Sequence, residues 1–179
     1  MKNVIIIASS PRKNGNSNAL VKAFEKGAKE AGNSVETVYL AGKKIEFCCG
    51  CMSCNHTLRC VIRDDVKEIL EKMQGADVVV FATPIYYYSV SGQLKTFFDR
   101  TSPLFAAEYQ FRDIYLLATA ADDGEETVKG TEEAVQGWIE CYPKTRLVKT
   151  IFAGGVDAVG DITGHKALIE AYDAGQNIV

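Results

Sequence analysis

Short apolar runs rich in valine and isoleucine alternate along this chain with amphipathic segments, and this alternation restricts the possible folds more than any other feature. Five runs predict β-strands, at residues 3–8, 34–40, 76–82, 114–119 and 147–153. Most are apolar throughout, as strands covered on both faces must be. Five segments show helical spacing, at residues 17–32, 65–73, 92–100, 126–142 and 163–174. The pattern predicts an α/β three-layer sandwich with helices on both faces of a parallel sheet.

The length and charge of the chain fit a single domain with neither nucleic acid nor a membrane as partner. The 179 residues are enough for one domain with a substantial core, and no repeat or linker divides residues 1–179. The net charge of −3 offers no attraction to nucleic acid or anionic lipid. The apolar runs are too short to cross a membrane, and the first is too short for a signal-peptide core. We therefore expect a cytoplasmic protein.

The first predicted strand ends in a polar loop that leads directly into the first predicted helix. This loop, residues 9–18, has the sequence SSPRKNGNSN. Its hydroxyl, amide and guanidinium groups, with the backbone N–H groups of a helix N-terminus, suit a phosphate. The candidate phosphate ligands are Ser10, Arg12, Asn16, Ser17 and Asn18. Gly15 is the one glycine of this loop, so the loop matches neither a P-loop nor a dinucleotide-binding fingerprint. The alternative is a loop that merely caps the N-terminus of the helix.

Two segments together resemble a known family. SPRKNGNS at residues 10–17 and TPIYYYSVSGQLKTFFDR at residues 83–100 are similar to segments of the NAD(P)H-dependent FMN reductases of the flavodoxin superfamily. The resemblance implies a flavodoxin-like sandwich with a five-stranded parallel sheet of order 2-1-3-4-5, and FMN bound between the first and third strands. It also implies NAD(P)H as co-substrate. Ser9 departs from the family, in which glycine is common, and leaves the backbone less freedom.

The resemblance also implies which residues contact the flavin. The second segment would supply Pro84, Ile85, Tyr86, Tyr87 and Ser89, and the loop after the fourth strand would supply Thr119 and Ala120. We expect Asp122 and Asp123, which follow, to point to solvent. Because the cofactor carries the chemistry, we expect no catalytic acid or base. Flavin sites of this kind are shallow and are completed by a second subunit, which implies a homodimer or homotetramer.

Five of the six cysteines lie between residues 48 and 60, within a long irregular segment at residues 41–63. A loop of this length in a compact domain is usually functional. The spacing of Cys48, Cys51, Cys54 and Cys60 resembles that of the iron–sulfur flavoproteins, which carry FMN and a [4Fe–4S] cluster. Zinc, or cysteines without metal that are free, redox-active or disulfide-bonded, are the alternatives that the same pattern allows. We expect Cys141, on an apolar helix face, to be a small core residue.

These features predict an FMN-dependent NAD(P)H oxidoreductase. Electrons would pass from the nicotinamide through the flavin, with or without a cluster, to an acceptor such as a quinone, a flavin or a redox protein. The alternative is a non-enzymatic electron-transfer flavoprotein that ferredoxin reduces. Lys95, Asp99 and Arg100, at the end of the second family segment, are expected to form structural ion pairs rather than to act in catalysis.

Overall fold

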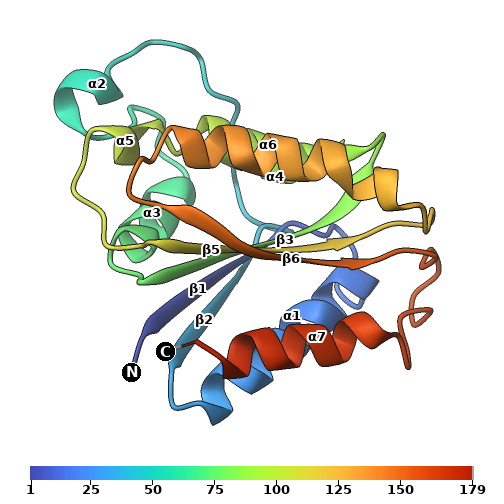
Figure 1. Cartoon of the computed structure of the whole chain (residues 1–179). Helices are drawn as coiled ribbons and strands as arrows, with labels where there is room; N and C mark the ends of the chain where they lie inside the picture. Colours follow the sequence, from blue (N-terminus) through green and yellow to red (C-terminus); the bar gives the residue numbers. More distant parts are fainter. Residues whose placement is uncertain (179) are drawn as a thin grey trace.

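A parallel sheet divides the molecule into two helical layers (Figure 1). The computed structural model describes residues 1–178. The strands are β1 (Asn3–Ala8), β2 (Ser34–Tyr39), β3 (Val78–Tyr86), β4 (Ser89–Val90), β5 (Asp113–Thr119) and β6 (Arg146–Ala153). The five long strands are parallel in the order β2-β1-β3-β5-β6, which confirms the predicted topology. The described sheet has six strands rather than five, because the short β4 pairs antiparallel with the end of β3.

The helices cover both faces of this sheet. They are α1 (Asn16–Glu30), α2 (Cys54–Thr57), α3 (Val66–Gln74), α4 (Gly92–Asp99), α5 (Ser102–Phe105), α6 (Lys129–Glu140) and α7 (Lys166–Gln176), with a 3₁₀ turn at Glu125–Val128. Figure 1 shows α1 and α7 on one face, and α3, α4, α5 and α6 on the other. Within residues 1–178, none of these helices combines the length and apolar character that crossing a bilayer requires.

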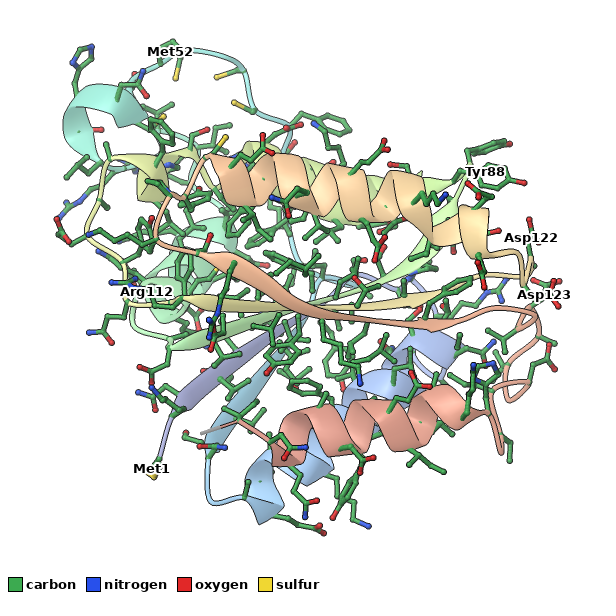
Figure 2. The ribbon with its side chains drawn as sticks, viewed as in Figure 1. Met1, Met52, Tyr88, Arg112, Asp122 and Asp123 are labelled. Atoms are coloured by element: carbon green, nitrogen blue, oxygen red, sulfur yellow. The ribbon has the colours of Figure 1, made fainter. Side chains whose placement is uncertain are left out.

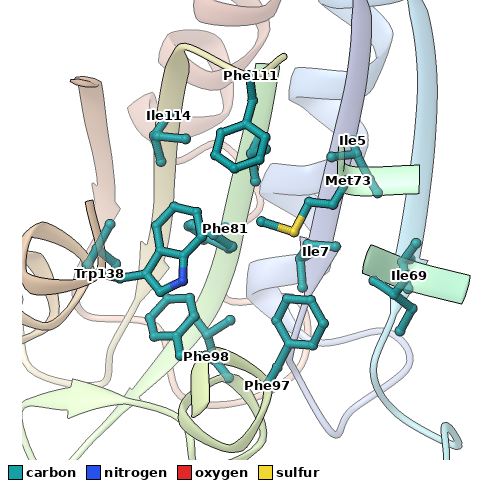
Figure 3. Packing of buried hydrophobic residues seen from close by; sticks show 14 of the residues in the cluster. Ile5, Ile7, Ile69, Met73, Phe81, Phe97, Phe98, Phe111, Ile114 and Trp138 are labelled. Atoms are coloured by element: carbon teal, nitrogen blue, oxygen red, sulfur yellow. The ribbon is translucent and has the colours of Figure 1, made fainter. Parts of the chain in front are cut away.

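Each central strand contributes side chains to two separate cores, which explains why the inner positions of these strands are almost all apolar. In β1, Val4 and Ile6 pack on the side of α1 and α7, whereas Ile5 and Ile7 pack on the opposite side. Successive residues of a strand point to opposite faces. The second core is rich in aromatic rings, and Figure 3 shows Phe81 at its centre. The Phe81 ring lies edge-on to two other rings, with centroid distances of 4.9 Å to Phe98 and 5.0 Å to Trp138.

Two expectations from the sequence need correction. The third strand does not end at residue 82 but continues to Tyr86, because residues 85 and 86 pair with β4. Cys141 is exposed rather than buried in the core. The reason is that α6 ends at Glu140, so Cys141 lies at the helix C-terminus instead of on its apolar face.

Candidate functional site

The loops that follow β1 and β5 meet the β3–β4 hairpin in one pocket of about 180 Å³ at the carboxyl edge of the sheet. The pocket is lined by Ser10, Arg12, Gly15, Asn16, Ser17, Pro84, Ile85, Tyr86, Thr119, Ala120, Ala121, Val156 and Asp157. In an open α/β sheet, ligands bind at this edge, where the strand order reverses. The structure therefore brings together nine of the twelve residues predicted to contact the cofactor.

The first loop presents the N-terminus of α1 to the pocket. Gly15 occupies the N-cap position, where no side chain among the described residues caps the helix. The Asn18 N–H donates to the Gly15 carbonyl at 3.0 Å, so in the described chain the N–H groups of Asn16 and Ser17 are left for a ligand, and the helix dipole favours an anion there. The loop is also tight, because a Cβ atom on Gly15 would lie 2.9 Å from Ser10 Oγ. A phosphate fits such a cradle.

Arg12 and Asn16 have partners on the loop that follows β6. Arg12 Nη1 donates to the carbonyl of Asp157 at 2.8 Å. The Asn16 side chain donates to the carbonyl of Ala158 at 2.9 Å and accepts from the Gly160 N–H at 3.2 Å. These contacts hold the fourth loop against the first. Both residues therefore also shape the pocket, a role that their sequence positions did not indicate.

Two of the remaining residues of the first loop, Ser17 and Asn18, are fixed by hydrogen bonds. The Ser17 and Thr119 hydroxyls lie 2.7 Å apart, and this contact ties the first loop to the third. Asn18 lies outside the pocket, and its amide donates at 3.1 Å to the carbonyls of Arg12 and Lys13. Its role in the structure is to hold the loop conformation.

Ser9, which departs from the family pattern, makes side-chain contacts that glycine cannot. Its buried hydroxyl donates to the carbonyl of Ala82 at 3.0 Å and accepts from the Ser91 hydroxyl at 2.8 Å. These bonds link the end of β1 to β3 and to the start of α4. Ser9 thus stabilises the base of the pocket.

The end of β3 forms a hairpin with β4, and the tip of this hairpin leaves the pocket. Pro84, Ile85 and Tyr86 line the pocket, whereas Ser89 pairs with Tyr86 across the hairpin. Tyr87 lies at the turn, fully exposed, so neither Tyr87 nor Ser89 reaches the pocket in the single chain. Tyr87 and Tyr88 both have positive φ, 49° and 59°, in a turn that normally contains asparagine and glycine.

The third loop brings small residues to the pocket and turns its carboxylates away. Thr119, Ala120 and Ala121 line the pocket. Asp122 and Asp123 are exposed, as predicted, and Figure 2 shows both at the outer edge beside Tyr88. The N–H of Gly124 donates to Asp122 Oδ1 at 3.1 Å and is the main reason why the pKa of Asp122 is lowered.

The sequence analysis missed the contribution of the fourth loop. Val156 and Asp157, which follow β6, complete the wall of the pocket. The signal was present in the glycine pair Gly154–Gly155, directly after the last predicted strand. A Cβ atom on Gly154 would lie 2.6 Å from the Asp123 Cα, so the third and fourth loops pack backbone against backbone.

A second pocket, of about 100 Å³, lies under the cysteine-rich loop at residues 41–63. All five cysteines of the loop line it: Cys48, Cys49, Cys51, Cys54 and Cys60. Figure 2 shows the sulfur atoms of this loop gathered near Met52. Each cysteine within residues 1–178 is a free thiol. His56 is exposed and does not line this pocket.

The donor set of this second pocket fits an iron–sulfur cluster chemically. The four cysteines named as candidate cluster ligands all line one small cavity, and thiolates are the ligands of such clusters. Hydrogen bonds from Ser53, chiefly from its backbone, lower the pKa of Cys51, which favours the thiolate that a metal requires. No three acidic, cysteine or histidine side chains in residues 1–178 are already arranged around a single metal position.

A buried ion pair lies at the base of the cysteine-rich loop. Arg100 Nη1 lies 2.6 Å from Asp64 Oδ2, and both side chains are fully buried. Burial opposes the charge of Arg100, but the neighbouring Asp64 carboxylate and Cys60 sulfur outweigh this effect and raise its pKa. Lys95 and Asp99 form a second pair, on the surface, with 2.6 Å between Lys95 Nζ and Asp99 Oδ1. All three residues thus form ion pairs, as expected, but the sequence analysis did not name Asp64 as the partner of Arg100.

Comparison with known proteins identifies related sequences. The sequence model of the NADPH-dependent FMN reductase family matches residues 2–145. An iron–sulfur flavoprotein from Methanosarcina thermophila is 33% identical over 153 residues, covering 84% of this chain and 79% of the relative. One from Archaeoglobus fulgidus is 41% identical over 97 residues, covering 54% and 44%. One from Methanocaldococcus jannaschii is 43% identical over 101 residues, covering 56% and 52%. In the last two comparisons the matched segment spans about half the length of the relative.

Solved structures share the fold of the chain at lower sequence identity. An NAD(P)H:quinone oxidoreductase from Methanothermobacter marburgensis has a TM-score of 0.81 at 21% identity, covering 98% of this chain and 95% of that protein. An azoreductase from Bacillus anthracis has a TM-score of 0.74 at 17% identity, covering 99% and 100%. These likenesses confirm the flavodoxin-like architecture.

Proposed function

Because the chain belongs to the NADPH-dependent FMN reductase family, we propose that it is an FMN-dependent oxidoreductase that passes electrons from NADH or NADPH to an acceptor. The observation that carries the proposal is the pocket at the carboxyl edge of the sheet, where the uncapped N-terminus of α1 meets three further loops. This arrangement offers an anion cradle and an open, largely uncharged surface in one place.

The chain's own residues would divide the binding of FMN between two parts of the pocket. Ser10, Ser17 and the backbone around Gly15 would hold the phosphate, because their donors surround the N-terminus of α1. Pro84 to Tyr86 and Thr119 to Ala121 would flank the ring, because small and aromatic side chains line that part. When bound, FMN supplies hydride transfer and electron storage, and the protein supplies position and electrostatics.

We further propose that Cys48, Cys51, Cys54 and Cys60 hold a [4Fe–4S] cluster. The five thiols that line one cavity and the similarity to iron–sulfur flavoproteins support this proposal. When bound, such a cluster supplies single-electron transfer. The residues of the chain would provide the sulfur ligands, and the buried, positively charged Arg100 lines the same pocket.

We propose that the working protein is a homodimer or homotetramer. Tyr87 is fully exposed at the tip of the hairpin that borders the FMN pocket, where a second copy would cover it. Light scattering at micromolar concentration tests this proposal, and a strict monomer would contradict it. We also propose a cytoplasmic location, because six free thiols suit a reducing compartment.

The decisive experiment combines a spectrum with a reduction assay. Protein purified without oxygen is examined by UV–visible spectroscopy and analysed for iron and acid-labile sulfide, then mixed with NADH or NADPH. Bound flavin that either nucleotide reduces rapidly supports the oxidoreductase. Flavin that only ferredoxin reduces supports the electron carrier instead, and failure to bind FMN contradicts both.

The same sample tests the cluster. About four irons and four sulfides per chain would support it. Zinc in place of iron would assign a zinc site. If iron and sulfide remain absent after anaerobic reconstitution, the thiols act without metal, and the chain is an FMN reductase alone.

A further inference from the structure

One guanidinium group closes the cysteine-rich loop. Arg100 follows α4, and its buried Nη1 donates to the carbonyl of Glu46 at 2.6 Å, at the start of the cysteine run. The same group forms a two-point contact with Asp64 at the other end of that run, with Nη1 at 2.6 Å from Oδ2 and Nη2 at 3.0 Å from Oδ1. Arg100 therefore bridges the two residues between which all five clustered cysteines lie.

The carboxylate of Asp64 completes this closure. Asp64 Oδ2 accepts from the Glu46 N–H at 2.9 Å, and Oδ1 accepts from the Val66 N–H at 3.2 Å. With the two bonds from Arg100, the carboxylate accepts four donors and is fully buried. The guanidinium of Arg100 and the carboxylate of Asp64 thus form hydrogen bonds with each other and with backbone groups at the base of the loop.

One donor of Arg100 remains unused. Its Nε–H is buried and has no hydrogen-bond partner within the described chain. Arg100 and all five cysteines of the loop line the same pocket. An unpaired buried donor is costly, by about 1–3 kcal/mol. A donor left unpaired at the wall of a thiol-lined cavity indicates that an anionic acceptor belongs there.

We propose that Arg100 is a positioning residue for an iron–sulfur cluster in this pocket, with its Nε–H directed to sulfur and its charge offsetting that of the thiolates. The inference rests on the cluster proposed above. Hydrogen bonds and positive charge near the sulfurs favour the reduced form of a cluster, and partners that orient ligands strengthen metal binding. Arg100 therefore makes the cluster easier to reduce and harder to lose.

Arg100→Lys and Arg100→Gln separate the contributions of geometry and charge. Lysine keeps the charge but has neither the fork nor the Nε–H, whereas glutamine also removes the charge. Arg63→Gln is the charge-matched control, because Arg63 belongs to the same loop but is exposed. Asp65→Asn is the control for the loop base, because Asp65 Oδ2 accepts from the Lys44 N–H at 2.7 Å and does not contact Arg100.

The measurements are iron and sulfide content, the rate of iron release to a chelator, and the midpoint potential from a redox titration followed by EPR. We expect iron release to become about 10-fold faster in Arg100→Lys, in line with lost outer-shell contacts to a metal site. We expect the potential to become more negative in Arg100→Lys and more negative still in Arg100→Gln. Both controls should match the parent protein in potential. If the role of Arg100 were purely structural, the potential of Arg100→Lys would match that of the parent and the controls as well.

The outcomes distinguish this inference from the function on which it rests. If the parent protein takes up no iron or sulfide on reconstitution, the cluster is wrong and the inference with it. If the parent holds a cluster, but Arg100→Lys keeps its potential and iron retention, only the role of Arg100 is wrong. If Arg100→Gln does not fold, the folded Arg100→Lys variant still decides between these results.

Discussion

The hairpin beside the proposed FMN pocket contains a backbone conformation that a single substitution should relieve. Tyr87 has φ 49°, in the left-handed region that a side chain with a Cβ atom adopts at a cost of about 1–2 kcal/mol. Tyr87 is fully exposed, so in the single chain the removal of its ring costs no buried contact. Tyr87→Gly should therefore relieve the strain, while Tyr87→Ala removes the same ring and keeps the Cβ atom.

We expect Tyr87→Gly to be more stable than Tyr87→Ala by about 1 kcal/mol, after the greater freedom of glycine in the unfolded chain is included. For a chain of this size the difference corresponds to about 2–4 °C in Tm. Urea unfolding and thermal melting, followed by circular dichroism, measure it. Because both variants lose the same ring, any contact of Tyr87 with a second copy cancels in the comparison. Equal stability of the two variants, or a more stable alanine variant, would refute the argument from strain.

Three further predictions follow from other contacts. Ser17→Ala removes the 2.7 Å contact with Thr119 and a hydrogen-bond donor at the proposed phosphate cradle. FMN should therefore bind about 10-fold more weakly, as measured by fluorescence titration. Unchanged affinity would contradict the assignment of the pocket. Asp64→Asn breaks the buried pair with Arg100 and should cost about 3–5 kcal/mol in urea unfolding; a loss below about 1 kcal/mol would show that the pair contributes little. Burial opposes the charge of Asp64, but hydrogen bonds from Arg100, Glu46 and Val66 outweigh this effect and lower the pKa of Asp64 in the folded protein. The ionised carboxylate therefore stabilises the fold fully above its unfolded pKa of about 4, and this stabilisation is lost as the pH falls through the folded pKa. Unfolding measured from pH 6 down to pH 2 should therefore show a steeper acid loss in the parent than in Asp64→Asn. Phe81→Ala removes the ring at the centre of the aromatic core and should cost about 3–5 kcal/mol, whereas a loss under 1 kcal/mol would mean that the core refills the space.

Local patterns predicted the framework of this protein because each depends on neighbours in the chain. The apolar run at residues 3–8 predicted a strand buried on both sides, and the structure confirms it as β1. The spacing of Leu20, Val21 and Phe24 predicted a helix with one buried face, and the structure confirms it as α1. The position of the phosphate loop between them followed as well. Its place at the edge of the sheet then followed from the rule that carboxyl ends of parallel strands meet.

Contacts between distant segments were not predictable in the same way. Arg12 and Asn16 were predicted as phosphate ligands, but the structure also gives them backbone partners on the loop after β6, more than 140 residues away in sequence. Tyr87 was predicted to contact the flavin, but the two-residue β4 places it at the tip of a hairpin. Neither arrangement has a local signal, since each depends on where another loop or strand lies.

Hydrophobic periodicity and residue type act over a few neighbouring positions, so the sequence was enough to predict the α/β fold and to mark the polar loop after β1 and the cysteine cluster. Which side chains face each pocket, and which support it, became visible only in three dimensions. The pairing of Arg100 with Asp64 and Glu46 is the clearest case. A buried charge is stable only where its partners converge on it in three dimensions, and the chain does not encode that convergence within any short segment.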